Sequence, residues 1–387
     1  MENIFELDQS YVASTYGRFP VQLVSGEGCT VTDVNGKTYI DLTSGIGVTA
    51  FGHNDTAWEE AVTAQLKALK HASNLYYTAP CAKLAKLLCE KTGMKKVFFA
   101  NSGAEANECA IKVARKYSAE KKGAAYYNII TLKNSFHGRT LTTLAATGQD
   151  HYHELFQPLT PGFLHVTAGD IGELEETVKH NPTAGIMLEI VQGEGGVLPL
   201  DGAYVKAVAQ LAKEQDIPLM IDEVQTGNGR TGMLYAYMHY GITPDIVSTA
   251  KGLGGGLPIG ACMMGEKVQN VLQPGEHGST YGGNPISCAG ALSVMSRMDD
   301  AFMAQVREKS DFVFNALKDA PGVEGVTGLG LMIGIKTVKP AKEVVSSCIE
   351  QGVLCLTAKD KVRLLPALNI PMEQLKTAVE VIKNTCR

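Results

Sequence analysis

From about residue 54, short apolar segments alternate with segments of helical periodicity. Trp58, Val62 and Leu66 recur at helical spacing, and a second helix is expected between Pro80 and Gly93. The segments expected as strands include KKVFFA, YYNIITL, AGIMLEIV, PLMIDEV and DIVSTA. Because short apolar strands separated by helices form sheets covered on both faces, this alternation predicts an α/β fold with a mostly parallel sheet.

The two ends of the chain follow a different pattern. The segment CTVTDVNGKTYIDL alternates around Asn35-Gly36, which predicts a hairpin with strands at about 29–34 and 37–42. A long helical stretch at about 285–320 precedes strands at VTGLGLMIGIK, VLCLTA and KVRLLPAL, with helices after Pro340 and Pro371. We therefore expect a large domain at 51–284 and a smaller α+β domain formed by 1–50 and 285–387.

Charge and polarity narrow the range of partners. Forty acidic residues against 35 Lys and Arg give a formal charge of −5, and no basic run occurs, so nucleic acid is not an expected partner. The longest uncharged stretch, 277–296, contains too many polar residues and glycines for a membrane span. Residues 1–10 are acidic and do not resemble a signal peptide, which predicts a cytoplasmic protein with small-molecule substrates.

The cysteines and histidines do not form a metal-binding pattern. None of the nine cysteines belongs to a CxxC pair, so they are expected to be reduced and packed as small apolar side chains. His151 and His153 are spaced as half of a metal site, but no third ligand is nearby and a surface pair is the preferred interpretation. No metal is expected.

Polar residues follow three of the expected strands. Asn101, Asp222 and Lys251 each stand at or just after a strand end, and the carboxyl ends of parallel strands meet at one edge of the sheet. Lys251 also precedes a glycine cluster that allows close approach of a ligand. A lysine is usually a solvated charge, but one partly desolvated in a crevice has a lowered pKa and is a candidate Schiff-base residue.

The segment Ser102-Gly103-Ala104 stands at the start of an expected helix, where free N–H groups attract anions. It is either a phosphate site or an ordinary N-cap. Asp222, at the end of a buried strand, either pairs with a cation or caps the next turn. Neither a Walker A motif nor a dinucleotide fingerprint is present. A phosphate site, an aspartate and a lysine together fit pyridoxal phosphate.

At this point the sequence resembles the class III, fold-type I pyridoxal-phosphate aminotransferases. The resemblance covers nearly the whole chain, through GEGCTVTDVNGKTYIDLTSGI, NSGAEANE, SFHGRT, QGEGG, DEVQTGNGRTG, AKGLGGGLPIGA, HGSTYGGNP and KVRLLPAL. It implies a large domain with a mostly parallel seven-stranded sheet covered by helices, and a smaller α+β domain formed by both termini. It also implies pyridoxal 5'-phosphate as the cofactor.

The resemblance assigns roles around this cofactor. Lys251 would form the Schiff base and move the substrate proton, and Asp222 would keep the ring nitrogen protonated. The other implied cofactor-binding residues are Gln225 at the phenolic oxygen, Phe136 and Val224 on the two ring faces, Ser102, Gly103 and Ala104 at the phosphate, and Thr280 at the phosphate from a partner subunit. The role of Thr280 implies a homodimer with shared active sites.

The resemblance also implies that two arginines bind the substrates. Arg139 would bind the donor carboxylate and later the distal carboxylate of glutamate, and Arg363 would bind the α-carboxylate of glutamate. Glu194 would cover Arg363 while the donor, which offers Arg363 no anionic partner, is bound, and Tyr16 would line the entrance. The alternatives are that Arg363 and Glu194 are surface charges and that Tyr16 is a packed aromatic residue.

Within the class, the resemblance implies transfer of the terminal amino group of N2-acetyl-L-ornithine to 2-oxoglutarate. The products would be N-acetyl-L-glutamate 5-semialdehyde and L-glutamate, formed by ping-pong chemistry in arginine biosynthesis. Succinyldiaminopimelate, ornithine and 4-aminobutyrate are alternative donors, and an aminomutase, a decarboxylase or a non-catalytic regulator are alternative functions. The chain departs from the family pattern at residues 52–56 and at Ala367, which puts an early loop and the substrate choice in doubt.

Overall fold

A computed structural model describes residues 3–387, so Met1 and Glu2, which open the expected N-terminal segment, lie outside it. The large sheet has seven strands in the order β4-β12-β11-β10-β7-β5-β6. Their bounds are β4 Lys96–Ala100, β5 Asn128–Leu132, β6 Phe163–Val166, β7 Thr183–Leu188, β10 Leu219–Asp222, β11 Ile246–Thr249 and β12 Gly260–Met264. Only β12 runs antiparallel to its neighbours, so the mostly parallel seven-stranded sheet is confirmed.

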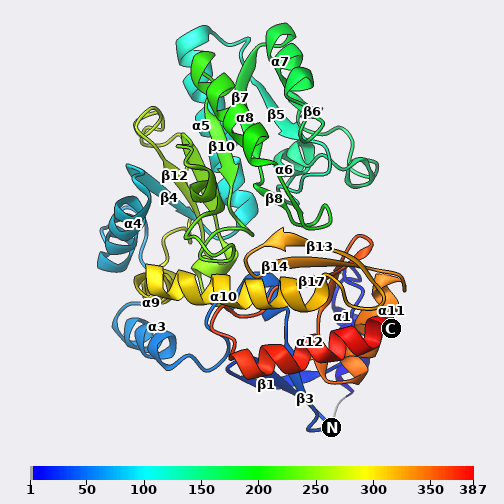
Figure 1. Cartoon of the computed structure of the whole chain (residues 1–387). Coiled ribbons are helices and arrows are strands. Elements are labelled where there is room, and N and C mark those ends of the chain that lie inside the picture. Colours follow the sequence, from blue (N-terminus) through cyan, green and yellow to red (C-terminus); the bar gives the residue numbers. More distant parts are fainter. Residues whose placement is uncertain (1–2) are drawn as a thin grey trace.

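Helices cover both faces of this sheet (Figure 1). Along β10 and β11, Met220 and Ile246 belong to one apolar cluster, and Ile221 and Val247 belong to the other. The first cluster packs against α5 and the second includes residues of α7 and α8. The bounds of the helices in this part of the chain are α5 Gly103–Lys122, α6 Leu141–Ala146, α7 Ile171–His180 and α8 Gly202–Glu214. Because both faces are buried, these strands are continuously apolar.

Segments from both ends of the chain build two four-stranded sheets, as expected for the smaller α+β part. One sheet has the order β1-β2-β3-β15 and the other β13-β14-β17-β16. The strands are β1 Leu23–Glu27, β2 Thr30–Asp33, β3 Thr38–Asp41, β13 Val323–Leu329, β14 Met332–Thr337, β15 Val353–Leu354, β16 Leu356–Ala358 and β17 Lys361–Leu364. The parallel pairing of β3 with β15 joins the N-terminal hairpin to the C-terminal segment.

The remaining helices lie beside these sheets or connect them to the large sheet. They are α1 Ile4–Tyr11, α2 Ser44–Gly47, α3 Thr56–Ala68, α4 Ala79–Thr92, α9 Pro285–Ser296, α10 Asp300–Leu317, α11 Ala341–Glu350 and α12 Met372–Cys386. Gly93 ends α4 in a left-handed conformation, and prolines precede α11 and α12, as expected. The C-terminus and α1 lie in the lower half of Figure 1 with α10 and α12. The boundaries at residues 50 and 284 stay predictions.

Four segments differ from the expectation. VTGLGLMIGIK turns back on itself as the antiparallel pair β13 and β14, and VLCLTA is divided between β15 and β16, which belong to different sheets. The stretch 285–320 is not one helix, because Asp299 caps a new helix by accepting a hydrogen bond from the backbone N–H of Phe302 at 2.8 Å. The segment 184–191 is not one strand, because β7 ends at Leu188 and the two-residue strand β8 (Val191–Gln192) pairs with β9 (Leu198–Pro199) instead. The break places Glu189 just after the carboxyl end of β7.

Candidate functional site

The carboxyl ends of β4, β10 and β11 border a cavity of about 470 Å³. The parallel register pairs Asp222 with Ser248, so the last residue of β10 lies beside the segment that leads to Lys251. Nine of the residues that the sequence predicted for the site line this cavity: Ser102, Gly103, Ala104, Phe136, Arg139, Asp222, Val224, Gln225 and Lys251. The topology of the sheet therefore brings together residues from distant parts of the sequence.

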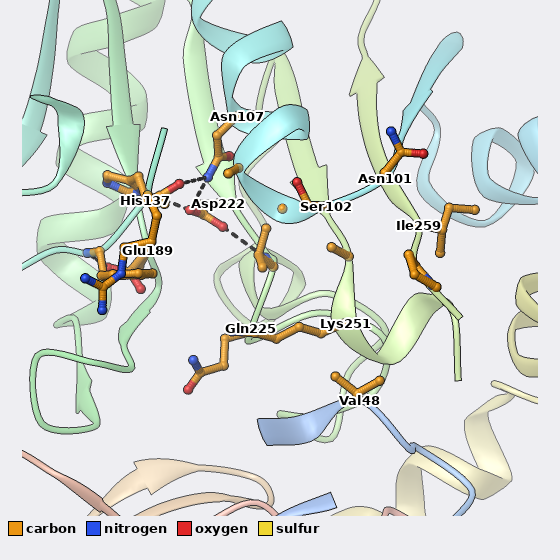
Figure 2. A pocket seen from close by; sticks show the side chains of 18 of the residues that line it. Val48, Asn101, Ser102, Asn107, His137, Glu189, Asp222, Gln225, Lys251 and Ile259 are labelled. Carbon is orange, nitrogen blue, oxygen red and sulfur yellow. Dashed lines mark hydrogen bonds and ion pairs between the residues drawn. The ribbon is translucent and has the colours of Figure 1, made fainter. Parts of the chain in front are cut away.

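Asp222 is buried and its carboxylate is held by three hydrogen bonds. Oδ2 accepts from Nδ2 of Asn107 and pairs with Nδ1 of His137, both at 2.8 Å, and Oδ1 accepts from the backbone N–H of Val224 at 3.0 Å (Figure 2). Burial alone would lower the pKa of His137, but its hydrogen bond to Asp222 and the nearby charges raise it. The carboxyl group of Asp222 is thus fixed in position, and Oδ1 keeps a lone pair for a further donor.

Lys251 is separated from the end of β11 by Ala250 alone and begins a short 3₁₀ turn, Lys251–Leu253. Its φ of 45° lies in the left-handed region, which costs a residue other than glycine about 1–3 kcal/mol. Burial lowers the pKa of the Lys251 amine, although the negative charge of Glu194 acts in the opposite direction. A lysine with a lowered pKa has a larger fraction of the neutral amine, which is the form that attacks a carbonyl.

The start of α5 provides an anion site at another part of the cavity wall. The hydroxyl of Ser102 accepts a hydrogen bond from the backbone N–H of Glu105 at 3.2 Å, so Ser102 is an N-cap. The N–H groups of Gly103 and Ala104 have no acceptor among residues 3–387. A Cβ at position 103 would lie 2.6 Å from Cγ1 of Val224, so only glycine fits. The N-cap and the phosphate site are therefore compatible interpretations, and this cradle fits the phosphate of the expected cofactor.

Arg363, on β17, forms an ion pair with Glu194. NH1 of Arg363 lies 2.5 Å from Oε1 of Glu194, and the side chains are 4% and 28% exposed. Gln225 bridges the pair to the cavity, since Nε2 donates to Glu194 at 3.3 Å and Oε1 accepts from Arg363 at 3.4 Å. Burial alone would raise the pKa of Glu194, but the charge of Arg363 and its hydrogen bond lower it. Arg363 is thus not a surface charge.

Three other predicted residues occupy more open positions. Arg139 lines the cavity but is exposed, and its guanidinium has no hydrogen-bonded or ionic partner in the described part of the chain. Thr280 is exposed and does not line the cavity. Tyr16 is 74% exposed and also lies outside the lining, so the structure brings it neither into the site nor into the core.

Sequence reasoning missed four buried polar residues at or near the site. Asn107 and His137 hold Asp222, and Glu189 accepts a hydrogen bond from the backbone N–H of Phe136 at 2.8 Å. Burial raises the pKa of Glu189 to about 8. A signal existed for each of these three: Asn107 follows Gly103 by one helical turn, His137 adjoins a predicted residue, and Glu189 interrupts an apolar strand.

The fourth missed residue is Arg230, a buried cation without a carboxylate partner in the part of the chain that the structure describes. Its NH1 donates to the carbonyl oxygens of Leu331, at 3.2 Å, and Pro366, at 2.5 Å. Burial lowers its pKa to about 9. Leu331 precedes β14 and Pro366 follows β17, so Arg230 fastens the loop after β10 to the strand that carries Arg363 and to its neighbour β14.

Residues 3–387 contain no group of three or more His, Cys, Asp or Glu placed to hold a metal ion. No helix within the same range is both long and apolar enough to cross a membrane.

The family model described as Aminotransferase class-III matches residues 11–386. Acetylornithine aminotransferase of Haemophilus ducreyi is 52% identical to this chain, with 98% of each chain covered. The protein of the same name from Methanocaldococcus jannaschii is 44% identical, with 98% of this chain and 97% of the relative covered.

Solved structures agree with these sequence relatives. Ornithine aminotransferase from Toxoplasma gondii superimposes with a TM-score of 0.95 at 30% identity, covering 99% of this chain and 94% of that chain. Acetylornithine aminotransferase from Elizabethkingia anophelis gives a TM-score of 0.88 at 31% identity, covering 99% of this chain and 97% of that chain.

Proposed function

Because the chain belongs to the class-III aminotransferase family, we propose that it transfers the terminal amino group of N2-acetyl-L-ornithine to 2-oxoglutarate with pyridoxal 5'-phosphate as cofactor. The observation that carries this proposal is the pairing of buried Arg363 with Glu194, joined through Gln225 to the cavity that Arg139 and Lys251 line. A donor with one carboxylate and an acceptor with two carboxylates require one permanently available arginine and one that can be covered.

When bound, pyridoxal phosphate supplies an electrophilic aldehyde and a ring that withdraws electrons from the substrate carbon bearing the reacting amine. Asp222, fixed by Asn107 and His137, would hold a proton on the ring nitrogen. The free N–H groups of Gly103 and Ala104 would bind the phosphate. These contacts match the charge of the cofactor at both of its ends.

Side chains from three other segments complete the proposed cofactor site. Phe136 and Val224 would cover the two faces of the ring, and Gln225 would bond the phenolic oxygen; all three line the cavity. Nζ of Lys251 would take the proton from the substrate carbon that carries the reacting amine, since its lowered pKa favours the neutral amine at working pH. The same nitrogen would return that proton at the cofactor carbon.

Arg139 would bind the carboxylate of acetylornithine, while Glu194 keeps Arg363 neutralised beside the uncharged methylene group that carries the reacting amine. When 2-oxoglutarate enters, its α-carboxylate would displace Glu194 from Arg363 and its distal carboxylate would bind Arg139. The 28% exposure of Glu194 supports this exchange, because a partly solvated carboxylate can leave the ion pair without being buried alone.

The test is an assay of glutamate formation from 2-oxoglutarate by the purified protein, with acetylornithine, ornithine, 4-aminobutyrate and succinyldiaminopimelate compared as donors. We expect the highest kcat/KM with acetylornithine, and a Lys251→Ala control slower by about 10²–10⁴-fold. A clear preference for free ornithine would reject the proposed donor. Absence of glutamate with every donor would reject the function.

A homodimer with Thr280 contributed to the partner's phosphate site is a further part of the proposal. Nδ2 of Asn74 donates to the carbonyl oxygens of Ser279 and Gly282, both at 2.9 Å, which joins residues 74–77 to the loop of Thr280. The exposed large hydrophobic residues of these two segments are Leu75, Tyr76, Tyr77 and Tyr281. Such a patch supports a subunit interface. Mixed dimers of Thr280→Ala and Lys251→Ala subunits test it, because only the mixed dimer would regain one intact site.

A place in arginine biosynthesis and a cytoplasmic location are also proposals. Deletion of the gene should make growth depend on added arginine, and cell fractionation should recover the protein with cytoplasmic markers. Arginine-independent growth of the deletion strain would argue against an essential role in that pathway.

A further inference from the structure

Tyr152 lies next to the arginine that would bind the substrate carboxylate. The guanidinium carbon of Arg139 is 4.4 Å from the centroid of the Tyr152 ring and 5.4 Å from that of Phe136. The two rings pack edge to face at 5.8 Å. With no hydrogen-bonded partner in residues 3–387, the exposed guanidinium is held mainly by these aromatic contacts.

The position of Tyr152 is itself fixed from both sides. It ends the short 3₁₀ turn Asp150–Tyr152, and its backbone N–H donates to the carbonyl oxygen of Gln149 at 3.1 Å. The side chain of Gln149 donates to the carbonyl oxygen of Ser135 at 3.0 Å. On the other side, Nε2 of His153 lies 2.7 Å from the carbonyl oxygen of Thr147. The ring therefore has a defined place relative to Arg139 rather than belonging to a free loop.

We propose that Tyr152 is a positioning residue that fixes the Arg139 guanidinium for substrate carboxylates. An unpaired, exposed arginine would otherwise lose side-chain freedom each time it binds an anion, and a pre-formed stack reduces that loss. Stacking on an aromatic ring also leaves the N–H edge of the guanidinium available for a bidentate contact. Tyr152 thus favours donors and acceptors that carry a carboxylate over amines of similar length without one.

This inference rests on the proposed function, and it is tested with the holoenzyme and two substitutions. Tyr152→Leu removes the aromatic face, whereas the matched control Tyr152→Phe keeps it and removes only the hydroxyl. A cation–π contact at an exposed site contributes roughly 0.5–1 kcal/mol, so Tyr152→Leu should raise KM for acetylornithine and for 2-oxoglutarate about two- to fivefold. Tyr152→Phe should stay near wild type. Tyr152→Met serves in place of the leucine variant if that variant aggregates.

Two further measurements separate positioning from a general structural effect. The decarboxylated donor analogue N-acetylputrescine lacks the group that Arg139 binds, so its kcat/KM should not change in Tyr152→Leu. In an Arg139→Lys background, Tyr152→Leu should add little further loss, because the two residues act as a unit. An equal loss with both donors, or full additivity with Arg139→Lys, would overturn the role.

A binding measurement gives a result without turnover. Calorimetric titration of the holoenzyme with glutarate, an unreactive dicarboxylate, should show a Kd two- to fivefold higher for Tyr152→Leu than for wild type. An unchanged Kd would overturn the inference even if amino transfer is normal. The same titration decides the role of Tyr152 if the wild-type protein makes no glutamate, so the two proposals fail separately.

Discussion

The ion pair between Arg363 and Glu194 predicts how the enzyme would distinguish its two substrates. Under the proposed roles, 2-oxoglutarate would displace Glu194 before its α-carboxylate reaches Arg363, whereas acetylornithine would leave the pair intact. Substitution Glu194→Ala removes this competitor. We expect 2-oxoglutarate to bind more tightly and acetylornithine to bind more weakly, because the end of acetylornithine that reacts carries no carboxylate and would then lie beside an uncompensated buried cation.

The size of the effect follows from the geometry. NH1 of Arg363 and Oε1 of Glu194 are 2.5 Å apart, and a hydrogen bond to a charged group contributes about 1.5–3 kcal/mol. The lower limit applies because the side chain of Glu194 is 28% exposed and solvent screens the interaction. A change of about 1.5 kcal/mol corresponds to roughly tenfold in a binding constant. The ratio of the two substrate affinities should therefore shift by about tenfold or more.

Single-turnover kinetics, followed by the absorbance of the cofactor, measures each half-reaction separately. The matched control is Glu194→Gln, which keeps the size and one acceptor oxygen of the side chain but removes its charge, so its shift should be smaller than that of Glu194→Ala. If both half-reactions of Glu194→Ala stay within twofold of wild type, Glu194 does not act as a switch and the exchange mechanism is refuted.

Three further predictions concern the buried polar groups. Asp222→Asn should keep the hydrogen bond from Val224 but slow amino transfer roughly 10²–10³-fold in steady-state assays, because the carboxylate is lost. A normal rate would exclude the proposed role of Asp222 at the ring nitrogen of the cofactor. Arg230→Met leaves the carbonyl groups of Leu331 and Pro366 unpaired and should lower stability by about 1–3 kcal/mol in urea unfolding, while an unchanged midpoint would contradict the fastening role. The pKa of Glu189 is raised from an ordinary 4.5 to about 8 in the folded protein, so the folded state binds this proton more tightly than the unfolded state. The contribution of Glu189 to stability is therefore full below pH 4.5 and is lost as pH rises through 8. Glu189→Gln should therefore flatten the fall in melting temperature of the cofactor-free protein between pH 5 and 8, and an equally steep fall in both proteins would rule this out.

The strand ends of the site could be predicted because a parallel sheet imposes a common direction. Lys251 and Asp222 each end an apolar segment, and the fold then requires both segments to point to one edge. The helix start at Gly103, the proposed phosphate site, could be located for a similar reason, since a helix that follows a strand starts at that edge. Such positions follow from local patterns and need no knowledge of side-chain packing.

Contacts between distant segments could not be predicted in this way. Arg363 and Glu194 are 169 positions apart, and without a family resemblance each looked like an ordinary surface charge. Asn107 and His137 hold Asp222 from a helix and a loop, and no periodicity relates them to it. Arg230 was missed because a glycine-rich loop is usually exposed, whereas here Arg230 is buried and donates to the carbonyl oxygens of Leu331 and Pro366.

The left-handed backbone at position 251 limits which residues fold well at this position. Steric considerations alone would favour glycine at this position, because a Cβ atom is disfavoured at positive φ. The side chain needed for the proposed chemistry therefore stands on a strained backbone. Reactivity and foldability therefore make opposite demands on one residue: the proposed chemistry needs a lysine, whereas the backbone conformation favours glycine.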